Sequence, residues 1–117
     1  MGETRIKLKI YGSDGGFEEI EAVVDTGATF SKIPFSLAQR LGLKARYETE
    51  VELGDGRIIK RGLALGEVEV EGIRRPVPIA MGGEEERATL GYTTLEILGF
   101  TVNPVTGRLE RTRAIEY

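Results

Sequence analysis

The sequence predicts an all-β domain that carries two short helices. Glycine makes up 16 of the 117 residues, about twice its usual share of roughly 7%. Apolar residues alternate with charged ones in short runs, a pattern typical of strands with one buried face. Clusters of glycine with aspartate or asparagine separate these runs, as tight turns require. The length and a hydrophobic content of 40% predict a single domain, residues 1–117, with a modest core.

The N-terminal part predicts a hairpin, a short strand and a helix. Apolar and basic residues alternate over 4–11, and the turn at 13–16 leads into a second strand over 17–24. A short strand over 30–33 precedes a helix over 34–41. This helix begins with a proline, which suits a first turn, and a glycine follows its last residue.

The middle of the chain predicts a second hairpin and two further strands. Strands over 47–53 and 58–65 flank the turn Gly54-Asp55-Gly56, a strong hairpin signal. Valine alternates with glutamate over 66–71, and an apolar strand follows over 77–81. We expect each of these segments to be a separate strand.

The C-terminal part predicts a polar loop over 82–87, a short apolar segment over 88–90 and a helix over 93–98 that a glycine ends. Two short strands, 100–102 and 108–112, enclose a turn and complete the chain.

Composition excludes most catalytic chemistries. The chain has no cysteine and no histidine, which removes disulfide scaffolds, thiol nucleophiles, Ser-His triads and almost every zinc or iron site. Consecutive glutamates over 84–86 could bind a hard cation, but neighbouring side chains diverge, so a solvated loop is the favoured interpretation. We therefore expect no metal and no cofactor, and any catalyst must use Asp, Glu, Lys, Arg, Tyr, Ser or Thr.

Charge and hydropathy restrict the partners. The net charge is −3 with interspersed signs, which favours neither nucleic acid nor an anionic membrane. The pair Arg74 and Arg75 is expected on a solvated face. No apolar run is long enough to span a membrane, and no secretory signal follows Met1, so the expected location is cytoplasmic. The abundance of Glu and Arg and the scarcity of Asn and Gln resemble the composition of proteins from heat-loving organisms.

The three aspartates differ in their contexts. Asp14 and Asp55 lie beside glycines in predicted turns, where a short side chain that accepts a backbone hydrogen bond is expected. Asp25 instead follows Ala-Val-Val at the end of a buried strand, where an ionised carboxylate is costly to place. Two interpretations remain open for Asp25 at this point: a residue that caps a turn, or a catalytic carboxylate.

Residues 23–29, Val-Val-Asp-Thr-Gly-Ala-Thr, resemble the active-site signature of aspartic proteases, in particular that of the single-lobe, retropepsin-like branch. The segment 88–91, Ala-Thr-Leu-Gly, resembles the element that precedes the C-terminal helix of that family. Residues 99–109 are similar to the end of its prokaryotic and archaeal members, and the 47–65 hairpin falls where the family places its flap. The resemblance covers about residues 4–110.

This resemblance implies a closed β-barrel that acts as a homodimer. One lobe supplies one aspartate, so the Asp25 side chains of two copies would meet on a two-fold axis and share a proton. One carboxylate would activate a water molecule while the other protonates the carbonyl of an extended polypeptide substrate. Peptide-bond hydrolysis of this kind needs no cofactor.

The resemblance also implies supporting roles. Thr26 would hydrogen-bond to its symmetry mate, Gly27 would allow close approach and bind substrate, and Ala28 would pack near the carboxylate. The flap tip would close over the peptide through four residues: Gly54, Asp55, Gly56 and Arg57.

Three alternatives stay open. The 47–65 hairpin can equally be an ordinary surface hairpin. The tail over 108–117 is charged and alternates poorly, so the dimer can use another surface or be weak. Tyr92 stands where many relatives carry a charged or polar residue, which leaves the contacts at that turn open. Finally, the fold can serve a non-catalytic module that binds peptides or dimerises.

Overall fold

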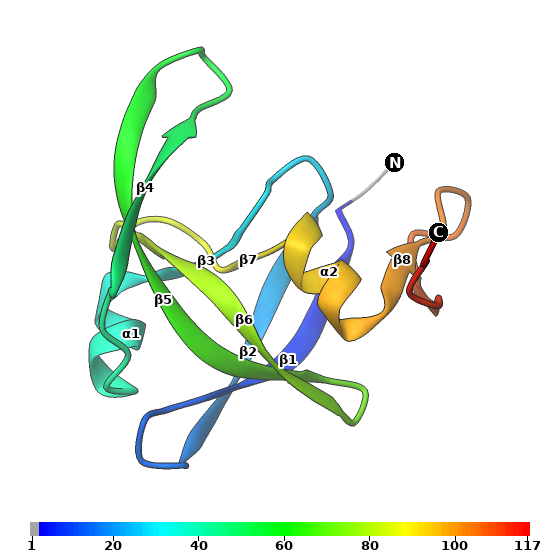
Figure 1. Cartoon of the computed structure of the whole chain (residues 1–117), viewed down its shortest axis with the longest axis horizontal. Helices are drawn as coiled ribbons and strands as arrows, with labels where there is room; N and C mark the ends of the chain where they lie inside the picture. Colours follow the sequence, from blue (N-terminus) through cyan, green and yellow to red (C-terminus); the bar gives the residue numbers. More distant parts are fainter. Residues whose placement is uncertain (1–2) are drawn as a thin grey trace.

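A computed structural model describes residues 3–117 and confirms the predicted all-β barrel with two short helices (Figure 1). The elements follow in the order β1 (Arg5–Tyr11), β2 (Phe17–Asp25), β3 (Ser31–Pro34), α1 (Phe35–Arg40), β4 (Tyr47–Glu52), β5 (Ile58–Val70), β6 (Ile73–Gly82), β7 (Thr89–Gly91), α2 (Tyr92–Leu98), β8 (Phe100–Val102) and β9 (Leu109–Arg111).

Six strands close into the barrel in the order β1-β2-β7-β3-β6-β5, and β5 returns to β1. The closing pairs are Lys9 with Glu69 and Ile10 with Val68. The pairs β2–β7 and β3–β6 are parallel, whereas the other contacts of the ring are antiparallel. Closure leaves no free edge in the ring itself.

The β4–β5 hairpin projects from the barrel (Figure 1). Strand β4 pairs only with the first half of β5, from Glu52 opposite Ile58 to Tyr47 opposite Leu63. The second half of β5 pairs with β6 and β1 and belongs to the ring. One strand therefore serves both the barrel and the projecting hairpin.

Strand β5 corrects the prediction of two separate strands over 58–65 and 66–71. Gly66, which suggested a break, lies inside the strand and pairs with Val77. A Cβ atom at position 66 would lie 3.1 Å from the Cδ1 atom of Ile79. Glycine therefore marks a crowded position in a continuous strand and not a turn.

Strand β6 begins at Ile73, four residues before the predicted start at residue 77. Glu71 and Gly72, with φ angles of 49° and 82°, form the two-residue turn between the paired residues Val70 and Ile73. Positive φ at both central positions is the geometry of a type I′ hairpin turn. This tight turn extends pairing into the polar segment that follows it, which the sequence did not mark as strand.

The core fills the barrel and extends to both helices. Buried aliphatic side chains from β1, β5, β6 and β7 form its centre, and Leu37 of α1 and Leu95 of α2 pack against the same cluster. Burial of each such side chain contributes about 1.5–3 kcal/mol. The largest fully buried side chains are those of Ile10, Ile79, Leu90, Val70, Val77 and Thr94.

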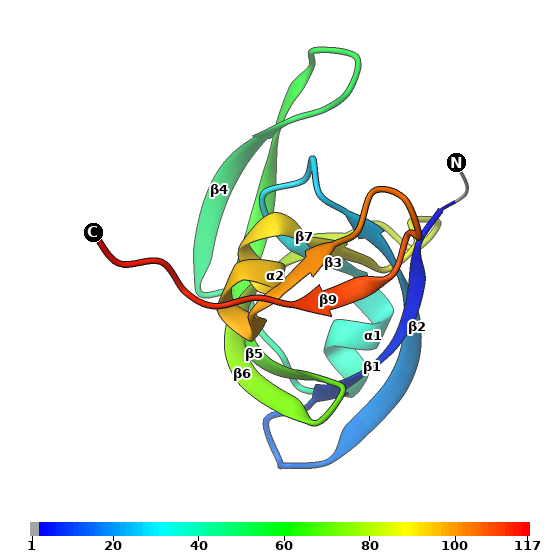
Figure 2. The same ribbon diagram turned by 90° about the vertical axis from the view of Figure 1, so that its right-hand side faces the viewer.

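Strands β8 and β9 form a separate two-stranded sheet after α2. The residues beyond β9 are exposed, and Figure 2 shows them passing α2 and leaving the body of the molecule. Within residues 3–117, neither helix is long and apolar enough to cross a membrane.

Candidate active site

Asp25 is the last residue of β2, at the point where this strand leaves the barrel. Parallel pairing with β7 sets Val24 opposite Leu90 and Asp25 opposite Gly91. The chain then turns, because the Ala28 N–H donates to the Asp25 carbonyl oxygen at 3.2 Å. The Gly27 N–H donates to Oδ1 of the Asp25 carboxylate at 3.0 Å. The exposed carboxylate is therefore held in place by its own loop.

The three aspartates make the same kind of turn contact. Oδ1 of Asp14 accepts the Gly16 N–H at 2.8 Å, and Oδ1 of Asp55 accepts the Arg57 N–H at 3.0 Å. The predicted turn roles of Asp14 and Asp55 are thus confirmed. Asp25 caps a turn as well, so this contact does not separate its two interpretations.

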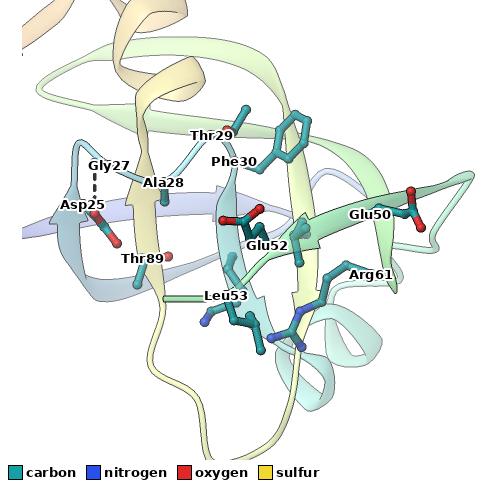
Figure 3. Close-up of a pocket in the computed structure, with 13 residues that line it drawn as sticks. Asp25, Gly27, Ala28, Thr29, Phe30, Glu50, Glu52, Leu53, Arg61 and Thr89 are labelled. Atoms are coloured by element: carbon teal, nitrogen blue, oxygen red, sulfur yellow. Dashed lines mark hydrogen bonds between the residues drawn. The ribbon is translucent and has the colours of Figure 1, made fainter. Parts of the chain in front are cut away.

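The surroundings of Asp25 are a groove of about 330 Å³. It lies between the loop after β2, strands β3 and β7, and the β4–β5 hairpin, which contributes the end of β4 next to the tip and Arg61 of β5 (Figure 3). The groove has both charged and apolar walls. Its lining residues are Asp25, Gly27, Ala28, Thr29, Phe30, Lys32, Glu50, Val51, Glu52, Leu53, Arg61, Ala80 and Thr89.

The structure brings together only some of the predicted site residues. Gly27 and Ala28 line the groove with Asp25, whereas Thr26 lines a different one, of about 560 Å³, beside α2 and the C-terminal tail. The hairpin tip, residues 54–57, is exposed and outside the lining of the Asp25 groove. The hairpin instead contributes Glu50, Val51, Glu52 and Leu53.

At the hairpin tip, the side chains of Asp55 and Arg57 form an ion pair. The Arg57 Nε atom lies 2.8 Å from Oδ2 of Asp55. Hydrogen bonds from the backbone N–H and then from the guanidinium of Arg57 lower the pKa of Asp55 below its ordinary value. The ionised pair stabilises the turn.

A buried hydroxyl pair fixes the far end of the Asp25 loop. The Oγ atom of Ser31 lies 2.6 Å from Oγ1 of Thr94 and accepts the Gly91 N–H at 3.0 Å. Ser31 and Thr94 are 4% and 0% exposed. Because buried polar groups are costly without partners, this pair joins β3, β7 and α2 at one defined position.

The start of α2 also holds the loop through its backbone. The Tyr92 N–H donates to the Ala28 carbonyl at 2.7 Å, and the Thr93 N–H donates to the Thr29 carbonyl at 3.0 Å. These helix-start donors have no partner within the helix. The Asp25 loop thus supplies acceptors for the first N–H groups of α2, and these hydrogen bonds in turn order the loop.

Sequence reasoning missed the roles of Ser31 and Thr94. Each has one apolar neighbour, Phe30 before Ser31 and Leu95 after Thr94, and the other neighbour is polar, so the local sequence does not mark either hydroxyl as buried. Their pairing over 63 positions in the sequence is a product of the barrel topology.

The prediction of a solvated loop over 84–86 is wrong for Glu86. Its Oε1 atom lies 2.8 Å from a guanidinium nitrogen of Arg61, and its Oε2 atom accepts the Gly83 N–H at 3.0 Å. The Nζ atom of Lys32 is 3.4 Å from Oε2. Glu86 thereby links the loop to β3 and β5.

The charge state of Glu86 follows from these contacts. Burial raises its pKa, but the hydrogen bonds from Arg61 and Gly83 and the charge of Lys32 outweigh burial. The net result is a pKa lowered from 4.5 to about 2. Glu86 is therefore an anion in all but strong acid.

The same loop also reaches α1, because Oε1 of Glu84 accepts the Ser36 N–H at 2.8 Å. Residues 3–117 contain no group of three acidic side chains placed to hold a metal ion. The chemistry that this part of the chain offers at the groove is that of carboxylates and cationic side chains.

Comparison with known protein families gives a match. A protein-family model described as aspartyl protease matches residues 6–102. This range includes every element from β2 to β8, most of β1, and all the residues that line the Asp25 groove. A search of curated proteins found no match.

We expect Thr94→Val to destabilise the fold by about 1–3 kcal/mol, because it leaves the buried Ser31 hydroxyl without its partner. Urea denaturation measures the free energy of unfolding. Thr93→Val is the matched control, since the Thr93 side chain makes no hydrogen bond within residues 3–117, and it should change stability by less than about 0.5 kcal/mol. Equal losses in both variants would contradict the role of the hydroxyl pair.

We expect Glu86→Gln to cost about 1–2 kcal/mol at neutral pH, after allowance for solvent screening. The folded-state pKa of Glu86, about 2, is below its ordinary 4.5. The stability from its ionised form is therefore complete above about pH 4.5 and disappears as the pH falls toward 2.

Urea denaturation across this pH range tests the expectation. The difference between wild type and Glu86→Gln should shrink toward acid, whereas Glu85→Gln, at an exposed position, should differ little at any pH. If the difference in free energy of unfolding between wild type and Glu86→Gln grows on acidification, the assigned role of the Glu86 carboxylate is wrong.

Proposed function

The chain belongs to the aspartyl protease family, and we propose that it hydrolyses peptide bonds through two Asp25 carboxylates, one from each copy of a homodimer. The observation that carries this proposal is the position of Asp25. It ends β2 within a groove, while Asp14 and Asp55, which make equivalent turn contacts, lie outside the groove lining. A carboxylate in a concave site is suited to act on a polypeptide that binds there.

The proposal of a dimer follows from the count of carboxylates at the site. One copy places a single aspartate in the groove, and the other acidic lining residues, Glu50 and Glu52, belong to the projecting hairpin. Two carboxylates can share a proton only when they are in contact. A second copy related by a two-fold axis supplies the missing carboxylate at the same position of its own chain.

Thr26 supports this arrangement. It directly follows Asp25 but lines the groove beside α2 and the C-terminal tail, with Tyr92, Ala114 and Ile115. Tyr92 is 54% and Ile115 is 76% exposed. This apolar surface next to the catalytic loop would be buried by a partner, and we assign Thr26 the role of bracing the two loops across the axis.

The proposed reaction needs only the dyad and water. One Asp25 is ionised and takes a proton from a water molecule as the oxygen attacks the scissile carbonyl carbon. The other Asp25 donates its proton to the carbonyl oxygen, which gives a neutral tetrahedral diol. The C–N bond then breaks as the first Asp25, now protonated, gives its proton to the leaving amine nitrogen. The other Asp25, now ionised, takes a proton from a hydroxyl of the diol, which gives the product carboxyl group and leaves the dyad with one proton again. The Gly27 N–H, bound to Oδ1, orients the carboxylate throughout.

The hairpin would bind the substrate backbone. Strand β4 pairs only with β5 within residues 3–117, so its outer edge can accept an extended peptide by strand addition. We propose that the hairpin acts as a flap, with residues 54–57 closing over the peptide, as glycines at a moving tip allow.

A second candidate function is a non-catalytic module that binds peptides in the same groove. The observation that favours it is the turn contact of Asp25, which matches that of Asp14 and needs no catalytic role. The two functions differ in their requirement for an ionisable side chain at position 25.

We expect Asp25→Asn to reduce cleavage of an unfolded polypeptide in acid by about 100- to 10,000-fold. Asparagine keeps an oxygen that can accept the Gly27 N–H, so thermal unfolding should be unchanged. Asp14→Asn, the same substitution in a similar turn, should retain full activity. If Asp25→Asn cleaves as fast as wild type, Asp25 is not the catalytic residue.

We expect the specific activity to rise with protein concentration and then level off, because only the dimer is active. Cleavage of a fluorogenic peptide is measured over a dilution series, with the fraction of dimer followed by sedimentation. Specific activity that stays constant while sedimentation shows dissociation into monomers would exclude a shared active site.

A further inference from the structure

We propose that the groove selects polypeptides that carry an acidic side chain, which binds to Lys32 and Arg61 at the part of the groove away from Asp25. This inference rests on the proposed function, since it names the substrate class of the same groove. It concerns a part of the lining to which the catalytic mechanism assigns no role.

The two cations are built into the walls of the groove. Lys32 lies on β3 and Arg61 on β5, and both belong to the lining. Their side chains are only 28% and 15% exposed. An anion that binds there is less screened by salt than one on an open surface.

One carboxylate serves both cations. Glu86 is the only ion-pair partner of either side chain within residues 3–117, at 2.8 Å from Arg61 and 3.4 Å from Lys32. The oxygen that faces Lys32 also accepts the Gly83 N–H. The three charges therefore sum to +1, and the Lys32 ammonium, which has three donors, retains capacity for another acceptor.

The acidic lining residues occupy different places. Glu50 and Glu52 lie on β4 and are exposed. In Figure 3 the Glu50 carboxylate and the Arg61 guanidinium extend in different directions, and Asp25 lies on the opposite side of the view from Arg61. In the same view Thr89, Leu53 and the Glu52 carboxylate lie between Asp25 and Arg61, so the Arg61 guanidinium stands apart from the proposed catalytic carboxylate.

Dimer symmetry extends the inference. A two-fold axis through the Asp25 pair repeats the Lys32–Arg61 subsite on the other side of the scissile bond. A peptide that spans both halves would meet one cationic subsite before the cleavage position and one after it. We therefore expect acidic preferences at equivalent positions on both sides.

The test uses one cleavable peptide, acetylated and amidated to remove terminal charges, with Glu, Gln or Lys placed in turn at each position. Assays at about pH 5.5 keep the peptide Glu ionised. We expect kcat/KM of the Glu peptide to exceed that of the Gln peptide by at least about 5-fold at one position on each side of the scissile bond. Lys32→Met should bring this ratio close to 1, Lys32→Arg should restore it, and Lys60→Met should leave it unchanged.

Lys60→Met is the matched control because Lys60 lies on the same hairpin, pairs with Glu48 and is outside the groove lining. If all peptides are cleaved, and the Glu and Gln peptides at equal rates, the inference is overturned but the protease function stands. A preference for Lys also overturns it and would assign selection to Glu50 and Glu52.

A binding measurement separates this inference from catalysis. If no peptide is cleaved, the proposed function fails, and fluorescence anisotropy of labelled Glu and Gln peptides with the full chain still measures the subsite. A Kd at least about 5-fold lower for the Glu peptide, lost in Lys32→Met, supports the inference. Equal Kd values, or no binding of either peptide, refute it.

Discussion

The close approach of Gly91 to the backbone of Phe30 is the constraint on which the Asp25 loop depends. A Cβ atom on residue 91 would lie 2.5 Å from the carbonyl carbon and oxygen of Phe30, a distance that no side chain tolerates. Glycine lets β7 pass close enough for its N–H to reach the Ser31 hydroxyl, which in turn meets Thr94. Both ends of the Asp25 loop are therefore held, one by strand pairing and one by buried hydrogen bonds. The Asp25–Asp25 contact that we propose would need a loop held in this way.

The groove combines two kinds of electrostatic environment. Beside Asp25 lie the Gly27 N–H and the small side chain of Ala28, which leave room for close approach to the carboxylate. At Lys32 and Arg61 the environment is cationic and is organised by Glu86. Because the pKa of Glu86 is about 2, this arrangement persists in the acidic conditions in which the proposed aspartate dyad would share a proton. The same ion pairs that order the 82–87 loop thus also shape the groove.

Much of the fold could be predicted because its signals are local. The turn chemistry of Asp14 and Asp55 and the glycine that ends α2 at residue 99 depend on residues within a few positions, and each lies where it was expected. The errors arose where distant residues decide. Gly66 lies within a strand, at a position where Ile79 leaves little room for a side chain. Glu86 binds Arg61, which is 25 positions away. Neither partner can be identified from local sequence.

The sequence by itself determined the class of chemistry. The chain has no histidine or cysteine, and its motif of adjacent residues around Asp25 pointed to a carboxylate mechanism. The predicted burial of the strand that ends at Asp25 was wrong, since Ala22 is the one buried residue of β2 and Asp25 is exposed. Only the tertiary structure decided which residues surround that carboxylate. Barrel closure brings β3, β5 and β7 together and so places Lys32, Arg61 and Thr89 in one groove. The physical reason is that a motif records local backbone geometry, whereas the walls of a site come from strands that meet only when the sheet closes.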